Sequence, residues 1–243
     1  EGGQREVRIT PAPDGYKEYQ QELQRRITAI RQRKGPPKKG EDIILRVIGD
    51  GRFSAIDMRF VDPSRANDPG SKLNQMLDAV IEDYHAMADH EYFDTVTGKP
   101  DPIKGASHLI FTDIGLGEQS AASRGFDMRR WIEKRLTDGG VPADHIAFMR
   151  DYKQHAKKER LFADMREGKK RVLIGGKEME TGTNVQKRLM TEDHLDAPWF
   201  PSSVEQREGR IVRQGNQNKQ VRIRAWATKG SYDSTMWGMN ARK

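Results

Sequence analysis

Three polar side chains late in the sequence have the types and spacing of an anion-binding helix face. Gln206, Arg210 and Arg213 stand at positions i, i+4 and i+7, so all three would project from one side of a continuous helix. The planar, permanently charged fork of arginine suits a phosphate better than the point charge of lysine. Gly209 lies beside them, and a helical glycine favours close approach by a ligand or another backbone. Taken alone, the same residues also fit a solvated basic helix face.

The segment before this helix predicts a strand followed by loops. Residues 172–174, Val-Leu-Ile, form an apolar run that glycines end, which is typical of a buried strand that carries a loop to the edge of a sheet. The loop candidates are Gly175-Gly176-Lys177 and Thr181-Gly182-Thr183-Asn184. Backbone N–H groups at glycines can approach a phosphate closely, and the lysine adds a charge.

The sequence also predicts where the arginine-bearing helix begins. Residues 196–201, Asp-Ala-Pro-Trp-Phe-Pro, predict an irregular, rigid passage that ends where the helix begins. Ser202 or Ser203 can cap the helix, and Ser203 with Gln206 fits the spacing of a capping box.

Several motifs in order resemble a known family. The run from Gln206 to Gln217 resembles the last conserved motif of superfamily-two helicases, in which a glutamine precedes two arginines that stand three residues apart. Residues 182–185, Asp196 and residues 199–201 are similar to the preceding motif and linker of the Swi/Snf-type translocases. The stretch from Gly182 to Arg213 also resembles helicase-like segments found beside adenine methyltransferases on phages and mobile elements.

The resemblance implies a role for each motif residue. Arg210 and Arg213 would act as catalytic arginine fingers toward the β- and γ-phosphates of a nucleotide. The residues implied to bind the nucleotide are Gln206, Gly182, Thr183 and Asn184, and those implied to contact the nucleic-acid backbone are Thr112, Gly175, Gly176 and Lys177. For Thr112 alone, a structural role at the end of a strand is the simpler interpretation.

The chain shows only half of the machinery that such a motor needs. The sequence has no G-x-x-x-x-G-K-[ST] phosphate loop and no acidic pair after an apolar strand to hold magnesium. ATP and Mg²⁺ are therefore expected on a first motor lobe N-terminal to Glu1, with neither held by this chain alone and no metal site of its own. The expected partners are that lobe, DNA (with RNA left open) and, from the resemblance only, a fused methyltransferase.

Two departures from the family pattern keep other functions open. Gly176 stands where most relatives have a hydroxyl residue, and Glu180 stands where many have a glycine, which places a negative charge near expected phosphates. A nucleic-acid-binding module or degenerate helicase lobe without motor action fits these departures. A fragment whose arginine helix binds a carboxylate of a protein partner is the third alternative.

Composition agrees with a globular chain that meets a polyanion. The 243 residues are 35% hydrophobic and 33% charged, with a net charge of +7 that favours nucleic acid. The absence of cysteine excludes disulfides and thiolate metal sites, and fits a reducing, cytoplasmic location. No apolar run is long enough to span a bilayer, so we expect no membrane contact. We also expect a monomer.

Strand and helix patterns alternate through most of the chain. Strands are expected at residues 6–9, 108–112, 146–149 and 172–174, the last three of them buried, and a more exposed strand is expected at residues 221–226. Helices are expected after Asp14, from Ser71, around residues 128–136 and 161–165, and from Ser231. The alternation predicts an α/β RecA-like lobe, with a mainly parallel sheet flanked by helices on both faces.

The N-terminal third is less regular. We expect residues 1–70 to be a helical linker from a missing first motor lobe, and residues 71–243 to be the helicase C-terminal domain. Residues 35–40 predict a loop, residues 43–48 are ambiguous between strand and helix, and Asp50-Gly51 predicts a turn.

Overall fold

The chain folds around one six-stranded sheet in which every pair of neighbouring strands is parallel. The computed structural model describes residues 5–240, and the strand order is β1-β6-β5-β2-β4-β3. The strands are β1 (Glu6–Thr10), β2 (Ser107–Phe111), β3 (Ile146–Phe148), β4 (Val172–Gly175), β5 (Leu189–His194) and β6 (Arg222–Thr228). The predicted α/β fold with a parallel sheet is confirmed.

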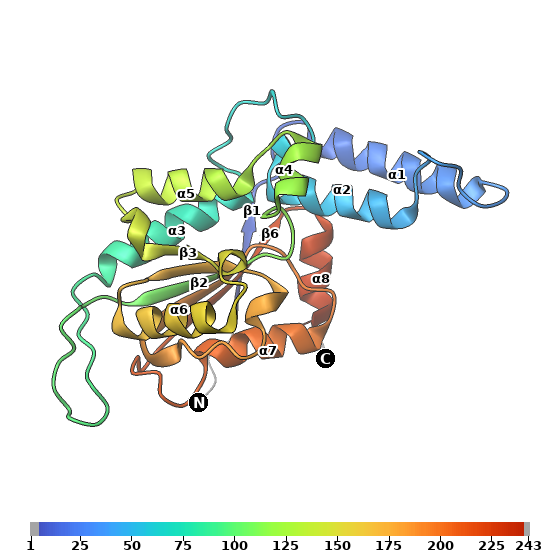
Figure 1. Cartoon of the computed structure of the whole chain (residues 1–243). Helices are drawn as coiled ribbons and strands as arrows, with labels where there is room; N and C mark the ends of the chain where they lie inside the picture. The colour runs from blue at the N-terminus through green and yellow to red at the C-terminus, as the bar shows by residue number, and fades with distance from the viewer. Residues whose placement is uncertain (1–4, 241–243) are drawn as a thin grey trace.

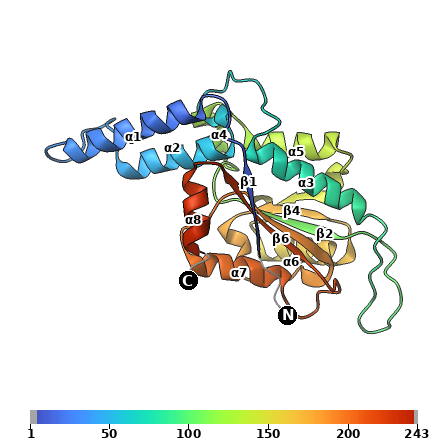
Figure 2. The same cartoon turned by 180° about the vertical axis from the view of Figure 1, so that it is seen from behind.

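Helices cover both faces of the sheet. They are α1 (Tyr16–Gln32), α2 (Ile44–Ile56), α3 (Lys72–Ala86), α4 (Glu118–Arg124), α5 (Met128–Asp138), α6 (His155–Glu167), α7 (Pro201–Ile211) and α8 (Tyr232–Asn240). In Figures 1 and 2, α3 and α5 lie on one face of the sheet, while α6 and α7 lie on the other. The first two helices pair as a hairpin that extends away from the rest of the molecule.

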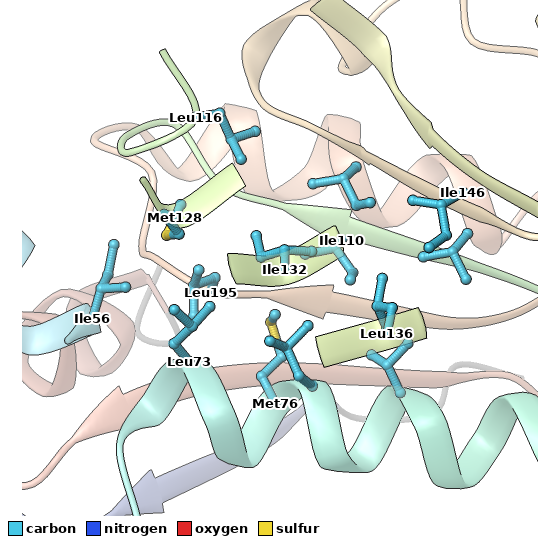
Figure 3. Close-up of a cluster of buried hydrophobic side chains, with 14 of the residues drawn as sticks. Ile56, Leu73, Met76, Ile110, Leu116, Met128, Ile132, Leu136, Ile146 and Leu195 are labelled. Atoms are coloured by element: carbon cyan, nitrogen blue, oxygen red, sulfur yellow. The ribbon is translucent and has the colours of Figure 1, made fainter. Parts of the chain in front are cut away.

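Side-chain alternation along β2 explains why both faces are covered. Ile110 belongs to the core cluster that α3 and α5 share with the sheet, whereas Leu109 and Phe111 belong to the cluster on the opposite face. Successive side chains of a strand point to opposite faces, so a strand that is apolar throughout needs helices on both sides. Figure 3 shows the first cluster, with Leu73 and Met76 of α3 facing Ile110.

Helix boundaries follow the capping signals in several places. Ser71 caps α3 as predicted, because its hydroxyl accepts a hydrogen bond from the backbone N–H of Asn74 at 3.4 Å. Gly168 ends α6 in the left-handed conformation, with φ of 87°, which glycine adopts without strain. The long α1 begins at Tyr16, directly after Asp14 and Gly15, and buries Tyr16 and Leu23.

The expected turn at Asp50-Gly51 is wrong, because both residues lie inside α2. Residues 44–56 form this helix, which settles the ambiguity at residues 43–48. Tertiary contact stabilises the helix despite its two glycines, since Val47 and Ile56 are fully buried. A Cβ on Gly51 would lie 3.4 Å from Cδ1 of Leu23 on α1, so this glycine faces the neighbouring helix at van der Waals distance.

The sequence analysis missed one strand and misjudged another. Strand β5, between β6 and β2, was not predicted because its residues 192–194 are Glu, Asp and His, all fully buried. Strand β6 was expected to be more exposed, but six of its seven residues are buried. Both errors have one cause: Asp193 accepts hydrogen bonds from Arg224 and from the indole N–H of Trp226, each at 2.7 Å.

Part of the segment 1–70 packs directly on this domain. Strand β1 pairs with β6 at the edge of the sheet, and Ile56 and Phe60 belong to the core cluster shared with α3 and α5. The boundary at residue 70 and the role of a linker stay predictions. Within residues 5–240, no helix is long and apolar enough to cross a membrane.

Candidate functional site

The carboxyl ends of the parallel strands bring three conspicuous loops to one edge of the sheet. Thr112 follows β2 directly, Gly176 follows β4 directly, and Asp196 lies two residues after the end of β5. In parallel α/β sheets, ligands bind outside the carboxyl ends of the strands. Of the predicted site residues, Thr112, Gly176 and Lys177 lie in these loops and Gly175 ends β4. Gly182, Thr183 and Asn184 lie in the connection from β4 to β5, Gln206 and Arg210 lie on α7, and Arg213 follows α7.

Helix α7 differs from its prediction at both ends. Phe200 occupies the N-cap position, no side chain caps the helix, and Pro201 opens its first turn, so the expected serine cap is wrong. Proline suits this position because the first helical N–H has no intrahelical partner. The helix ends at Ile211, so Arg213 lies beyond it and the expected continuous face of three residues is also wrong.

The two predicted finger residues nevertheless lie near each other. Arg213 is exposed and Arg210 is half-buried, with its Nε donating a hydrogen bond to the backbone oxygen of Gln206 at 3.1 Å. Burial and the charge of Arg213 lower the pKa of Arg210, and Glu192 opposes this shift. An anion placed between the two guanidinium groups would relieve their repulsion. A Cβ on Gly209 would meet no atom within 4 Å, so the space beside them is open.

The residue that fixes α7 in place is Arg207, which the sequence analysis did not single out. Its side chain is fully buried, and its Nη2 donates to both carboxylate oxygens of Asp113 at 2.7 and 2.8 Å. Glu180 accepts from Nε at 2.9 Å and from Nη2 at 2.7 Å. Although burial alone would lower it, these carboxylates raise the pKa of Arg207. One guanidinium therefore joins α7 to the loops after β2 and β4.

A second buried ion pair continues this network. The backbone N–H of Asp113 donates to Asp196 at 3.1 Å, and Arg52 of α2 donates to Asp196 at 2.9 Å. Burial raises the pKa of Asp196 to about 6, although the charge of Arg52 opposes the shift. The guanidinium of Arg52 also lies 5.1 Å from the ring centroid of Trp199, just before α7. Asp196 thus connects the base of α2 to the edge of the sheet.

Thr112, Gly175 and Gly176, which the resemblance implies to contact nucleic acid, lie together in a closely packed corner. The N–H of Thr112 donates to the oxygen of Gly175 at 2.8 Å, and the buried Thr112 hydroxyl donates to the oxygen of Ile114 at 2.9 Å. A Cβ on Gly176 would lie 2.7 Å from the oxygen of Thr112. The absence of a hydroxyl residue at position 176 therefore has a steric reason within the fold.

The rest of this loop divides into buried and exposed residues. Lys177 is exposed, whereas Glu180 is buried against Arg207, so the Glu180 charge is neutralised inside the protein. Gly182 has φ of 70° and Asn184 is exposed. Thr183 is buried, and its hydroxyl oxygen has no hydrogen-bond partner. Lys177, Gly182 and Asn184 are thus the predicted residues of this loop that remain open to a ligand.

A basic cleft at the same edge was found only in the structure. It measures about 850 Å³ and lies where the loops after β2, β3 and β4 meet. Its cationic lining consists of Arg129, Arg150, Lys153 and Lys158. Asp151 forms a two-fold ion pair with Arg129, and Glu178 lies 3.8 Å from Arg150. The lining also includes Glu118, Asp151 and Glu178, so the four cations exceed the acidic residues by one positive charge. Arg150, Lys153 and Lys158 could reach a phosphate in this cleft.

Comparisons with known proteins agree with this geometry. Residues 121–215 match the helicase conserved C-terminal domain. The fold matches the C-terminal part of the Fun30 ATPase domain with a TM-score of 0.60 at 13% identity, covering 97% of this chain and 88% of that one. It matches the SWI2/SNF2 ATPase core of Sulfolobus solfataricus, solved with double-stranded DNA, with a TM-score of 0.59 at 15% identity, covering 98% and 44%. The chain therefore has the RecA-like fold of these ATPase lobes, and residues 121–215 are similar to the helicase C-terminal domain. We call the chain the lobe from here on.

A relative from a phage agrees with the resemblance to mobile-element proteins. The lobe is 37% identical over 75 residues to the defense against restriction protein B of Escherichia phage P1. That match covers 31% of the lobe and only 3% of the phage protein, so the lobe corresponds to a small part of that relative.

The lobe's own residues fit an anionic nucleotide but show no site for a metal ion. Arg210, Arg213 and Gln206 reach the surface around the open space at Gly209. Across residues 5–240, no group of three or more His, Cys, Asp or Glu side chains could hold a metal.

Proposed function

We propose that this lobe supplies Arg210 and Arg213 as arginine fingers to a nucleotide held by another lobe of the parent protein, an ATP-dependent helicase or translocase. When bound, ATP with Mg²⁺ supplies the phosphoryl group whose transfer drives motion. The two guanidinium groups stabilise the negative charge that develops on the phosphates, a contribution of roughly 10³–10⁵ in rate for such a finger. Gln206, Gly182, Thr183 and Asn184 are proposed to contact the nucleotide.

The observation that carries this proposal is the way Arg207 anchors α7. Arg207 is fully buried between Asp113 and Glu180, whereas Arg210 on the same helix reaches the surface. Positioning of a catalytic group requires a rigid support, because small displacements cost much of the rate. The buried ion network thus holds α7 with Arg210 outward, and Arg213 follows two residues after the helix end.

The proposed path for nucleic acid follows the carboxyl edge of the sheet. Lys177 is exposed there, and Arg150, Lys153 and Lys158 line the adjacent cleft. Thr112, Gly175 and Gly176 would contribute through the loop backbone that they shape. Contacts to phosphates carry little sequence information, which suits a motor that moves along a strand.

The decisive experiment is nucleic-acid-stimulated ATP hydrolysis by the parent protein. The double variant Arg210→Ala, Arg213→Ala should lose hydrolysis by at least about 10³-fold while it keeps most of its affinity for nucleic acid. The matched control is Arg130→Ala, Lys134→Ala, which removes two exposed cations from α5 on the opposite face of the sheet. We expect wild-type hydrolysis from the control.

Equal hydrolysis by the wild type and the finger variant would contradict the proposal. If nucleic acid still binds in that case, the lobe acts as a nucleic-acid-binding module without motor action. Salt titration tests that alternative, because phosphate contacts weaken steeply as salt rises.

A further inference from the structure

The hairpin of α1 and α2 forms an arm that projects from the lobe. The two helices run antiparallel and extend together away from the sheet in both views (Figures 1 and 2). Helix α1 has 17 residues, which at about 1.5 Å per residue gives the arm a reach of roughly 25 Å. The loop that joins the helices, residues 33–43, lies at the far end, and we call it the tip.

Nearly all of the lobe's net charge lies on the outer part of this arm. Residues 25–46 contain eight arginines and lysines but only two acidic residues, a net charge of +6, whereas the whole chain carries +7. The remaining residues are therefore close to neutral, with a net charge of +1. Such a concentration of one sign attracts a polyanion and costs stability through self-repulsion, so it calls for a functional reason.

The two acidic residues of the outer arm, Glu41 and Asp42, are already engaged in holding it together. Arg26 donates to both carboxylate oxygens of Asp42 at 2.7 and 2.8 Å, and Arg33 lies 3.4 Å from Glu41. The side-chain hydrogen bond from Arg26 is the main cause of the lowered pKa of Asp42. These pairs leave the exposed side chains of Lys34, Lys38 and Lys39 to give the tip its excess charge.

Ionic contacts also tie the arm to the ligand-binding edge of the sheet. Asp50 of α2 accepts from Arg26 at 2.8 Å and from Arg124 at 2.6 Å. Arg124 ends α4, the helix that follows the loop after β2, and its guanidinium lies 3.8 Å from the ring centroid of Phe53. The arm is therefore fixed in direction relative to the edge where Lys177 and the basic cleft lie.

We propose that Lys34, Lys38 and Lys39 at the tip bind the phosphate backbone of a nucleic acid beyond the segment that the strand-end loops hold. This inference rests on the proposed function only in that the same nucleic acid contacts both surfaces. The arm's reach equals about seven base pairs at 3.4 Å each, so the tip would lengthen the footprint by that order.

Apolar side chains beside the tip lysines fit the same ligand. Ile43, Ile44 and Leu45 are 41%, 39% and 68% exposed, although they are large and apolar. Proteins that follow a groove place cations on the phosphates and apolar side chains against the sugars and base edges. The density of charge favours nucleic acid over a protein partner, whose carboxylates are rarely so closely spaced.

The test measures the affinity of the parent protein for duplex DNA as salt rises from about 50 to 200 mM. The variant Lys34→Gln, Lys38→Gln, Lys39→Gln removes three charges, so the slope of log K against log salt should become less steep by about 2.7. The wild type should therefore lose roughly 40-fold more affinity than the variant across this range. The matched control Lys17→Gln, Lys219→Gln, Lys229→Gln removes three exposed lysines outside the tip, and should keep the wild-type slope.

An unchanged slope in the tip variant would overturn the inference, as would equal effects of the tip and control variants. Preferential binding of the wild type to anionic phospholipid vesicles, with DNA affinity unaffected by the tip variant, would overturn it too. ATP hydrolysis separates this result from the proposed function. The tip variant should keep full hydrolysis at saturating DNA, whereas the Arg210, Arg213 variant should lose it with the salt slope intact.

Discussion

Arg207 and Asp113 form a bidentate contact in which one guanidinium nitrogen donates to both carboxylate oxygens at 2.7 and 2.8 Å. The two residues lie 94 positions apart, one on α7 and the other in the loop after β2. Glu180 approaches the same guanidinium from the loop after β4. The direction of the proposed finger helix is therefore set by a buried charge cluster at the strand ends.

Removal of Arg207 should strongly destabilise the fold. In the Arg207→Ala variant, Asp113 and Glu180 lose the cation that neutralises them, and loss of one member of a buried ion pair costs about 3–5 kcal/mol. Urea unfolding followed by circular dichroism measures this change. Gln206→Ala, an exposed position on the same helix, is the control and should change the free energy of unfolding by less than about 0.5 kcal/mol. Similar values for both variants would show that the cluster does not hold α7.

Two glycines near the site should respond to alanine in opposite directions. In Gly176→Ala the new Cβ would lie 2.7 Å from the backbone oxygen of Thr112, so the loop must shift and the free energy of unfolding should fall by about 1–3 kcal/mol. In Gly209→Ala the Cβ enters open space inside α7, and stability should rise by roughly 0.5–1 kcal/mol. Thermal unfolding of the two variants beside the wild type tests the contrast.

Activity adds a second readout to Gly209→Ala. If a nucleotide approaches Arg210 across the open space at Gly209, the more stable variant should hydrolyse ATP more slowly. A Gly209→Ala variant that is more stable and fully active would show that no ligand occupies the space beside this glycine.

The buried strands were predictable because they need no partner to explain them. Residues 172–174 and 109–111 are short runs of apolar residues that polar residues or glycines bound on each side. Their hydrophobicity alone therefore predicts burial. The α3 helix was similarly clear from its apolar stripe and the cap at Ser71. Strand β5 could not be predicted in this way because it contains the buried, charged residue Asp193. Its carboxylate is satisfied inside the protein by hydrogen bonds from Arg224 and Trp226, which lie more than thirty positions away.

The residues of the candidate site were also only partly predictable from the sequence. Arg210 and Gln206 were found because the motif around them resembles that of a known family. Arg207 stands in the same motif but could not be given its role, since its partner Glu180 is 27 residues away and Asp113 is 94. The inference that Glu180 would face phosphates shows the limit clearly, because only the fold reveals that Arg207 neutralises it.

Acid should destabilise the lobe through His108. This histidine is fully buried on β2, and burial, with Arg171 and Arg224 nearby, lowers its pKa to about 3. Between pH 6.5 and 3 the unfolded chain binds a proton at this site that the folded chain does not, so stability is lost as pH falls. From pH 7.5 to 5.5 the wild type should lose about 1.4 kcal/mol more than His108→Gln in urea unfolding. Parallel pH profiles for the two proteins would contradict the assignment.

Alkaline pH should destabilise the lobe through Glu192 and His194, which lie on β5 with Oε1 and Nε2 3.0 Å apart and neither side chain exposed. Burial raises the pKa of Glu192 well above its usual value and lowers that of His194 to about 3, so the folded pair keeps one proton on Glu192. In the unfolded chain above pH 6.5, Glu192 is ionised and His194 is neutral, so the pair holds no proton there. The folded state then binds one proton more than the unfolded state. The free energy of unfolding should therefore fall by about 1.4 kcal/mol per pH unit until Glu192 ionises in the folded state. Glu192→Gln keeps a neutral side chain of the same shape but cannot titrate, so its urea unfolding should lack this decline above pH 7. If the variant declines as steeply as the wild type, Glu192 is already ionised in the folded lobe and a proton is held by His194 or by neither residue.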